Sequence, residues 1–414
     1  MRPRALLVAA ASALLSTGAL AGGAAAAQQQ EPEDDPIRTL VSRLTLENYK
    51  ATLKGLTQFG DRRQGTQRNR DAVAWIEAQL QTFGCSNTQR ITYTYDPPPP
   101  NPNRGGGGGG APAEPPDLTT PTGGLVGRNG NGPGGSSIYG YRARTGVNRD
   151  LMAQPDERIR ELNREEPVNG ERTEVYCTKV GTTRPNEMYI VGAHMDGHGV
   201  NEAVNDDGSG TALVMELARV FNAPDVQTDV SVRFALWNNE ETGLNGARAY
   251  VEQRQALQGI EDPPGSGRYP EPKWLGMIQH DMMMWDHGNP VQHRQVLDAD
   301  VDIEFQLNSA KASESAMLAL RLLNSNRMFA TDYPAAMSNS MSNTDSGPFM
   351  DLIPAVSLRE NRRLYETGRG ANPHWHQRTD LYVTFSDADF RLAFNAMQTT
   401  LGAVGQLVEA RIVR

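Results

Sequence analysis

Short groups of acidic residues and histidines lie between residues 194 and 281, each beside an apolar run. The first group is His194-Met195-Asp196, which directly follows the apolar residues 189–193. Residues two apart on an extended segment share a face, so Asp196 can orient the imidazole of His194, as carboxylates do behind metal-bound histidines. Taken alone, this pair is equally consistent with a hydrogen-bonded pair at the surface.

The second group is Asn205-Asp206-Asp207-Gly208-Ser209-Gly210, just before a helical pattern at 211–221. By itself it favours an Asp-Gly turn with Ser209 as the N-cap of the helix. A carboxylate in such a tight loop is nevertheless well placed to bridge two cations.

The third group contains two adjacent glutamates, Glu240 and Glu241, directly after the apolar run 230–237. Adjacent side chains in a tight turn point in different directions, so one glutamate can bind a metal while the other transfers a proton. The competing interpretation is the exposed acidic start of a helix. The position directly after a buried strand favours the functional interpretation.

Two further groups complete the set: His280-Asp281 follows the apolar run 275–279, and His374 and His376 lie in a loop near the C-terminus. The strand-end groups together supply two histidines, two aspartates and one glutamate as ligands, with a second glutamate to spare. This set suits a two-zinc hydrolytic centre in which one carboxylate bridges the ions. Residues 282–284 are methionines and fit the core better, since thioethers prefer softer metals.

The elements that carry these groups are short apolar strands alternating with amphipathic helices from residue 173 onward. This alternation predicts an α/β sheet covered by helices on both faces. In such sheets functional groups gather at the C-terminal ends of the strands, where these groups fall.

Five motifs, in this order, resemble those of peptidase family M28, which includes secreted bacterial aminopeptidases and glutamate carboxypeptidases. The resemblance covers roughly residues 40–92 and 172–410. It implies a zinc-exopeptidase (phosphorylase/hydrolase-like) fold: α/β, with a mixed, mostly parallel sheet sandwiched between helices. The motifs are Gly192-Ala-His-Met-Asp196, Asn205-Asp-Asp-Gly-Ser-Gly210, Asn239-Glu-Glu-Thr-Gly243, Gln279-His-Asp-Met282 and His376-Gln-Arg-Thr-Asp380.

The resemblance implies two Zn²⁺ ions and hydrolysis of peptides by metal-activated water. His194 and Asp281 would bind one zinc, Glu241 and His376 would bind the other, and Asp206 would bridge them.

The same resemblance assigns two catalytic roles. Glu240 would be the general base, which takes a proton from the bridging water and delivers it to the leaving amine. Asp196 would orient His194 without touching the metal.

The chain departs from the family pattern in several places. Trp375 and Met341 stand where a tyrosine is expected to hold the oxyanion, which leaves that donor unassigned and Tyr365 as a candidate. The stretch 344–346 reads Thr-Asp-Ser instead of the usual Ser-Asp-His. An added loop at 263–267 is interpreted as a rim of the substrate cleft.

The leading hypothesis is an aminopeptidase that removes N-terminal residues from peptides. A carboxypeptidase acting on C-terminal acidic residues would need basic pocket residues, and Arg359, Arg362 and Arg363 leave this alternative open. A glutaminyl cyclase-like acyltransferase with one zinc is disfavoured by the presence of both Glu240 and Glu241. A metal-free binding module on the same fold is the non-enzymatic alternative.

The N-terminus predicts export. Basic residues, an apolar run and small residues through Ala27 are typical of a signal peptide at 1–27, which implies a secreted or periplasmic product with no membrane segment after cleavage. The chain of 414 residues has a formal charge of −9, which disfavours a nucleic-acid partner. The expected partner is a peptide substrate, and the oligomeric state stays open.

Residues 28–414 are expected to form a single peptidase domain, interrupted at about 97–135 by a disordered insert rich in glycine and proline. The two cysteines, Cys85 and Cys177, suit an oxidising compartment if they pair. Spacing alone does not decide between a disulfide and two separate buried thiols.

Overall fold

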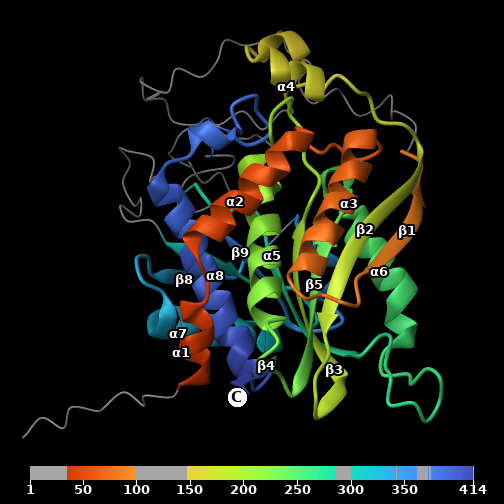
Figure 1. Cartoon of the computed structure of the whole chain (residues 1–414), viewed down its shortest axis with the longest axis vertical. Coiled ribbons are helices and arrows are strands. Elements are labelled where there is room, and N and C mark those ends of the chain that lie inside the picture. Colours follow the sequence, from red (N-terminus) through yellow and green to blue (C-terminus); the bar gives the residue numbers. More distant parts are fainter. Residues whose placement is uncertain are drawn as a thin grey trace, which may run out of the picture. The chain divides into compact units, whose positions relative to one another are not determined.

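Alternating strands and helices form the structure, a computed structural model that describes residues 35–97, 147–285, 300–341, 343–360, 372 and 374–413 (Figure 1). The strands are β1 (Gln89–Tyr95), β2 (Gly170–Lys179), β3 (Arg184–His194), β4 (Val226–Gln227), β5 (Val230–Trp237), β6 (Lys273–His280), β7 (Val301–Glu304), β8 (Ala335–Ser338), β9 (Ala355–Arg359) and β10 (Arg411–Ile412). The helices are α1 (Pro36–Ser42), α2 (Leu46–Leu56), α3 (Gln67–Thr82), α4 (Glu157–Leu162), α5 (Ser209–Phe221), α6 (Asn245–Arg254), α7 (Ala312–Phe329) and α8 (Asp387–Leu407).

Eight of these strands form one mixed sheet in the order β1-β2-β5-β3-β6-β9-β7-β8. The central strands β5, β3, β6 and β9 run parallel. At one side β2 pairs antiparallel with β5 and with β1, and at the other β7 pairs antiparallel with β9 and parallel with β8. The predicted α/β fold with a mixed, mostly parallel sheet is therefore confirmed.

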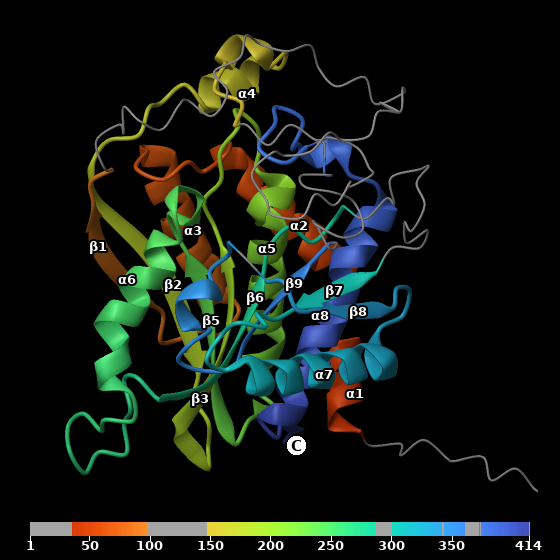
Figure 2. The same ribbon diagram turned by 180° about the vertical axis from the view of Figure 1, so that it is seen from behind.

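Helices cover both faces of the sheet. In Figure 1, α2, α3, α5 and α8 lie in front of the strands, and in the reverse view of Figure 2, α6 and α7 are nearest the viewer. The side chains of the central strands alternate between two apolar clusters. Val191 and Leu236 pack in the larger cluster with α2, α3 and α5, whereas Ile190 and Trp237 pack in the smaller one beside α6. Alternation with period two is what a sheet buried on both faces requires.

The start of α3 has a side-chain N-cap, whereas the start of α5 differs from the sequence-based expectation. α3 begins at Gln67, and the side chain of Thr66 accepts the backbone N–H of Asn69 as the N-cap. Ser209 is the first residue of α5 rather than its N-cap, and its hydroxyl donates to the carbonyl of Asn205 at 2.7 Å.

The four central parallel strands end at the same edge of the sheet. Their last residues are His194, Trp237, His280 and Arg359. The loop at 263–267 lies at the opposite edge, because it leads into the N-terminal end of β6 (Figure 2). The interpretation of this loop as a rim of the substrate cleft is therefore wrong.

Several predictions concern parts of the chain outside the described residues. The proposed signal peptide at 1–27 and residues 98–135 of the proposed insert are among them. Within the described ranges, no helix is both long and apolar enough to cross a membrane.

A disulfide joins Cys85, just after α3, to Cys177 in β2, with 5.9 Å between the two Cα atoms. Both cysteines are fully buried. The bond links the helical N-terminal part to the sheet and closes a chain segment of 92 residues.

We expect the double variant Cys85→Ala/Cys177→Ala to lose about 2–5 kcal/mol of free energy of unfolding, because a long closed loop restrains the unfolded chain. Chemical denaturation with and without reductant measures this. Reductant should destabilise the wild type and leave the double variant unchanged; a wild type that does not respond to reductant would contradict the expected stabilisation.

Candidate metal centre

A first group of potential ligands, His194, Asp206 and Asp281, lies buried at the ends of β3 and β6. Nε2 of His194 is 3.3 Å from Oδ1 of Asp206 and 3.8 Å from Oδ1 of Asp281. Nδ1 of the same imidazole is 2.9 Å from the backbone carbonyl of Asp196. Donation from Nδ1 leaves the Nε2 lone pair directed at the two carboxylates, which is the form that binds a metal.

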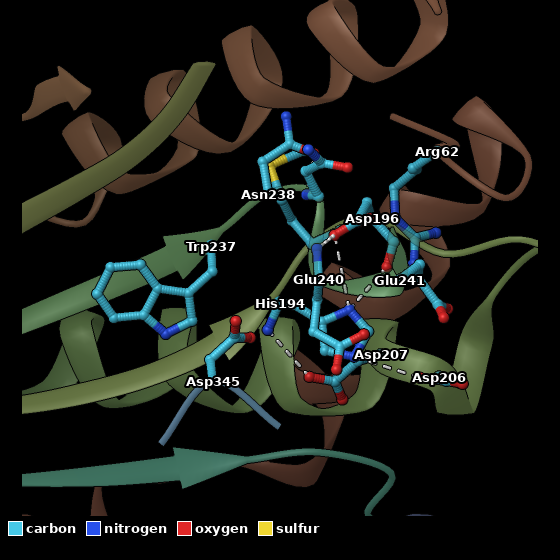
Figure 3. A network of polar contacts seen from close by, with 12 residues as sticks. Arg62, His194, Asp196, Asp206, Asp207, Trp237, Asn238, Glu240, Glu241 and Asp345 are labelled. Atoms are coloured by element: carbon cyan, nitrogen blue, oxygen red, sulfur yellow. Dashed lines mark hydrogen bonds and ion pairs between the residues drawn. The ribbon is translucent and has the colours of Figure 1, made fainter. Parts of the chain in front are cut away.

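Asp196 is fully buried and contacts both His194 and Glu240. Its backbone carbonyl orients His194, while its carboxylate Oδ1 lies 3.7 Å from Nδ1 of that imidazole. The same Oδ1 accepts the backbone N–H of Glu240 at 3.0 Å (Figure 3). Asp196 thus links the end of β3 to the turn after β5.

The two aspartates between β3 and α5 have separate environments. Asp206 lies between two histidines, with Oδ1 3.3 Å from Nε2 of His194 and Oδ2 3.0 Å from Nε2 of His376. Burial opposes its ionisation, but the two imidazoles outweigh it and hold the pKa of Asp206 well below its usual range. One carboxylate facing two imidazoles has the arrangement of a bridging ligand.

Asp207 instead ties three segments together. Its carboxylate accepts the backbone N–H groups of His194 at 3.2 Å, Gly210 at 2.9 Å and Met282 at 3.2 Å. These donors belong to the end of β3, the start of α5 and the segment after β6. Burial raises the pKa of Asp207 well above its usual value.

A second group of potential ligands contains His198, Glu241 and His376. Nε2 of His198 and Nε2 of His376 each lie 3.0 Å from Oε2 of Glu241. His376 also faces Asp206, so the two groups share this carboxylate. Sequence reasoning missed His198, although the pattern His194-x-Asp196-x-His198 was a signal that could have identified it.

The adjacent glutamates after β5 have opposite electrostatics. Burial raises the pKa of Glu240 well above its usual value, with the charge of Glu241 adding to the shift and that of His194 opposing it. Burial acts on Glu241 too, but the charges of His198 and His376 outweigh it and lower its pKa to about 2. Neighbouring carboxylates with pKa values pushed apart are suited to different tasks, proton transfer for one and metal binding for the other.

Arg359, at the end of β9, pairs with the carboxylate oxygen of Asp281 that does not face His194. Its Nη2 lies 3.0 Å from Oδ2 of Asp281, and its Nε lies 3.3 Å from Glu304. The guanidinium is fully buried, so it compensates both carboxylates and fixes the orientation of Asp281.

Arg62, from the turn before α3, holds the loop that follows β3. Its guanidinium donates to the carbonyls of Met195, Glu202 and Ala203 at 2.7–2.8 Å, and it is fully buried. The sequence contains no local signal for this role, because 133 residues separate Arg62 from Met195.

Non-glycine residues with positive φ are concentrated in the loops that carry the site. They include Val200 and Ala203 after β3, Asn239 after β5, Met282 after β6, and His376. The left-handed region is unfavourable for such residues and persists where the surroundings impose it, commonly at functional sites.

The remaining sequence-based candidates lie outside the two groups. Nδ1 of His374 is 2.8 Å from the hydroxyl of Thr379, and Met341 accepts a hydrogen bond from Ser346. Trp375 contacts His376 through its ring, and Tyr365 lies outside the described residues.

The donor set fits zinc. Both groups consist of imidazoles and carboxylates, the ligands of hydrolytic zinc sites. In the second group, three buried atoms make no hydrogen bond with any described residue: Nε2 of His198, Oε1 of Glu241 and Nδ1 of His376. Buried polar atoms without partners are costly, and a bound cation relieves that cost.

The sequence profile described as Peptidase family M28 matches residues 174–400, more than half of the chain. The chain belongs to this family. The match includes all five motifs and both ligand groups.

Among family relatives, the chain is 41% identical over 92 residues to the probable lipoprotein aminopeptidase LpqL of Mycobacterium tuberculosis, covering 22% of this chain and 18% of that protein. It is 31% identical over 120 residues to leupeptin-inactivating enzyme 1 of Streptomyces exfoliatus, covering 29% and 24%. The alignments thus span less than a quarter of these relatives' lengths.

Solved structures of aminopeptidases and of a glutaminyl cyclase share the fold. The aminopeptidase LapA of Legionella pneumophila superposes with a TM-score of 0.55 at 15% identity, covering 94% of this chain and 79% of that one. The zinc aminopeptidase BSAP of Bacillus subtilis gives 0.54 at 13%, covering 88% and 95%. Glutaminyl cyclase of Porphyromonas gingivalis gives 0.52 at 13%, covering 89% and 98%.

We expect Arg62→Lys to lose about 2–4 kcal/mol of free energy of unfolding, because an ammonium group cannot reach three separate carbonyls. Zinc affinity should fall roughly 10–100-fold, the usual cost of disturbing groups behind a metal site. Denaturation and zinc titration measure both effects. Arg63→Lys is the matched control, since Arg63 pairs with the exposed Glu166; equal behaviour of the two variants would contradict the role of Arg62.

Proposed function

We propose that this M28 family member is an exported di-zinc aminopeptidase that removes N-terminal residues from peptides. The observation that carries the proposal is the carboxylate of Asp206 between Nε2 of His194 and Nε2 of His376, with a further ligand set on each side. His194, Asp206 and Asp281 would hold one zinc, and Asp206, Glu241 and His376 the other. When bound, the two ions would supply a Lewis acid for the peptide carbonyl and lower the pKa of water in the site.

Glu240 is the proposed general base. It takes a proton from the attacking water as the new C–O bond forms, and it delivers that proton to the amine nitrogen as the C–N bond breaks. Its raised pKa suits both steps, because a base that must return its proton works best near the operating pH. Asp196 holds the backbone of Glu240 in place.

The charge of the site favours a substrate with a free α-amino group. Carboxylates dominate the centre, and the guanidinium of Arg359 is already engaged by Asp281 and Glu304. This weighs against Arg359 as the reader of a substrate carboxylate; Arg362 and Arg363 lie outside the described residues. Two complete ligand groups weigh against a one-zinc acyltransferase and against a metal-free binding module.

The proposed location outside the cytoplasm depends on the predicted signal peptide. The disulfide between Cys85 and Cys177 agrees with an oxidising compartment. A relative described as a lipoprotein aminopeptidase agrees with export as well.

We expect the zinc-loaded chain to hydrolyse aminoacyl-arylamides, to lose activity with a chelator and to regain it when zinc is added. The Nα-acetylated form of the same substrate should not be cleaved, because it lacks the free amine. Cleavage of C-terminal glutamyl peptides, or cyclisation of N-terminal glutamine, without hydrolysis of free-amino substrates would sink the aminopeptidase proposal.

Substitutions at Glu240 and Asp206 distinguish the proposed general base from the proposed metal ligand. Glu240→Gln should lower kcat roughly 10²–10⁴-fold and leave zinc content unchanged, because it removes proton transfer and no ligand. Asp206→Asn should lose zinc, since both ions depend on that carboxylate. Steady-state kinetics and metal analysis of both variants measure the difference, and equal zinc loss in the two would refute this division of roles.

A further inference from the structure

His198 lies on the loop after β3 and faces the second ligand group. Its imidazole and that of His376 are nearly perpendicular, with 89° between the rings and 4.2 Å between their centroids. Both rings place Nε2 3.0 Å from the same oxygen, Oε2 of Glu241. Two imidazoles therefore converge on one carboxylate oxygen.

The contact between His198 and Glu241 does not have hydrogen-bond geometry. Nε2 of His198 is buried and makes no hydrogen bond with any described residue, although Oε2 of Glu241 is only 3.0 Å away. A hydrogen bond needs the N–H directed at its acceptor. Ligands of one ion instead point at a common centre, and with zinc–ligand bonds of about 2.0–2.2 Å the ligand atoms of a tetrahedral site lie roughly 3.3–3.6 Å apart, close to the 3.0 Å between Nε2 of His198 and Oε2 of Glu241.

Buried amides fix the loop of His198 against the loop of His376. The side chain of Asn201 donates to the carbonyls of His198 at 3.1 Å and Gln377 at 2.8 Å. The side chain of Gln154 donates in the same way to Val200 and Arg378, both at 2.9 Å. Each amide joins the two loops, and both amides are fully buried.

Gly199 permits this close approach. Its φ is +121°, and a Cβ at this position would lie 2.8 Å from the backbone carbonyl of His376. The position of His198 relative to His376 is therefore built into the fold rather than left to a free surface side chain.

We propose that His198 is an additional zinc ligand, which gives the second group four protein ligands against three in the first. This inference rests on the proposed di-zinc function and deepens it. The second group then consists of His198, Asp206, Glu241 and His376. Zinc sites with four protein ligands are closed, whereas three-ligand sites keep a position for water or substrate. The first group, which contains His194 and Asp281, therefore keeps the open position for water or substrate. The second group binds its zinc more tightly than the first.

The decisive variant is His198→Gln, which removes the imidazole and keeps a polar side chain. We expect the affinity for one of the two zinc ions to fall roughly 100-fold or more, beyond the 10–100-fold cost of losing a group behind the ligands. Equilibrium dialysis against graded free zinc measures both dissociation constants. The matched control is His374→Gln, because His374 bonds to Thr379 and belongs to neither group; it should retain both affinities.

A spectroscopic readout separates ligand loss from general damage. In the cobalt-substituted protein, His198→Gln should change the visible absorption of one ion and leave the other unchanged. X-ray absorption at the zinc edge should count three imidazoles for two ions in the wild type and two in the variant. Circular dichroism of the metal-free proteins checks that the variant folds.

One outcome of these experiments would refute the ligand assignment of His198, and another would refute the proposed function. If His198→Gln keeps both zinc affinities and the cobalt spectrum while KM or kcat changes, His198 contacts substrate and the ligand assignment is wrong. If the wild type itself binds fewer than two zinc ions, or hydrolyses no free-amino substrate, the proposed function fails instead.

Discussion

Buried negative charge at one edge of the sheet is the constraint on which the rest of the centre depends. Asp196, Asp206, Asp207, Asp281 and Asp345 are buried there, and Glu240 lies beside them. Unpaired buried charges are costly, so each carboxylate must gain a proton, a cationic partner or a metal. Burial raises the pKa values of Asp207, Glu240 and Asp345, and the guanidinium of Arg359 neutralises Asp281 in part. The carboxylates of Asp206 and Glu241 instead face imidazoles, so the part of the centre between them is suited to divalent cations.

The loops around this charge are held by one another rather than by regular secondary structure. Asp207 joins three of them, Asp380 accepts the N–H groups of Asn205 and Asp206, and Arg62 fixes the segment after β3 from outside the sheet. Such cross-links explain how residues with positive φ persist in every loop of the site. The scaffold thereby holds the potential ligands in position, and such preorganisation is the condition for catalysis by fixed charges.

The strands and their terminal motifs were predictable because their signals are local. The run 230–237 coincides with β5, and the motifs at strand ends come together because parallel strands bring their C-terminal ends to one edge. The missed features depend on distant partners. Arg62 contacts a loop more than 130 residues away, and nothing near Asp207 in the sequence distinguishes it from Asp206. His198 was not predicted because the sequence does not show that the loop of His376 lies against the loop that carries His198.

The fold alone does not select the reaction, because aminopeptidases and a glutaminyl cyclase superpose on this chain about equally well. The side chains at the strand ends, rather than the fold, determine which reaction such a protein can catalyse. In the proposed aminopeptidase, Asp206 with ligands on both sides would bridge two ions, and Glu240 beside them would take up a proton and return it. Peptide hydrolysis needs that returned proton for the leaving amine, and in this proposal the burial that raises the pKa of Glu240 would help one carboxylate to perform both transfers.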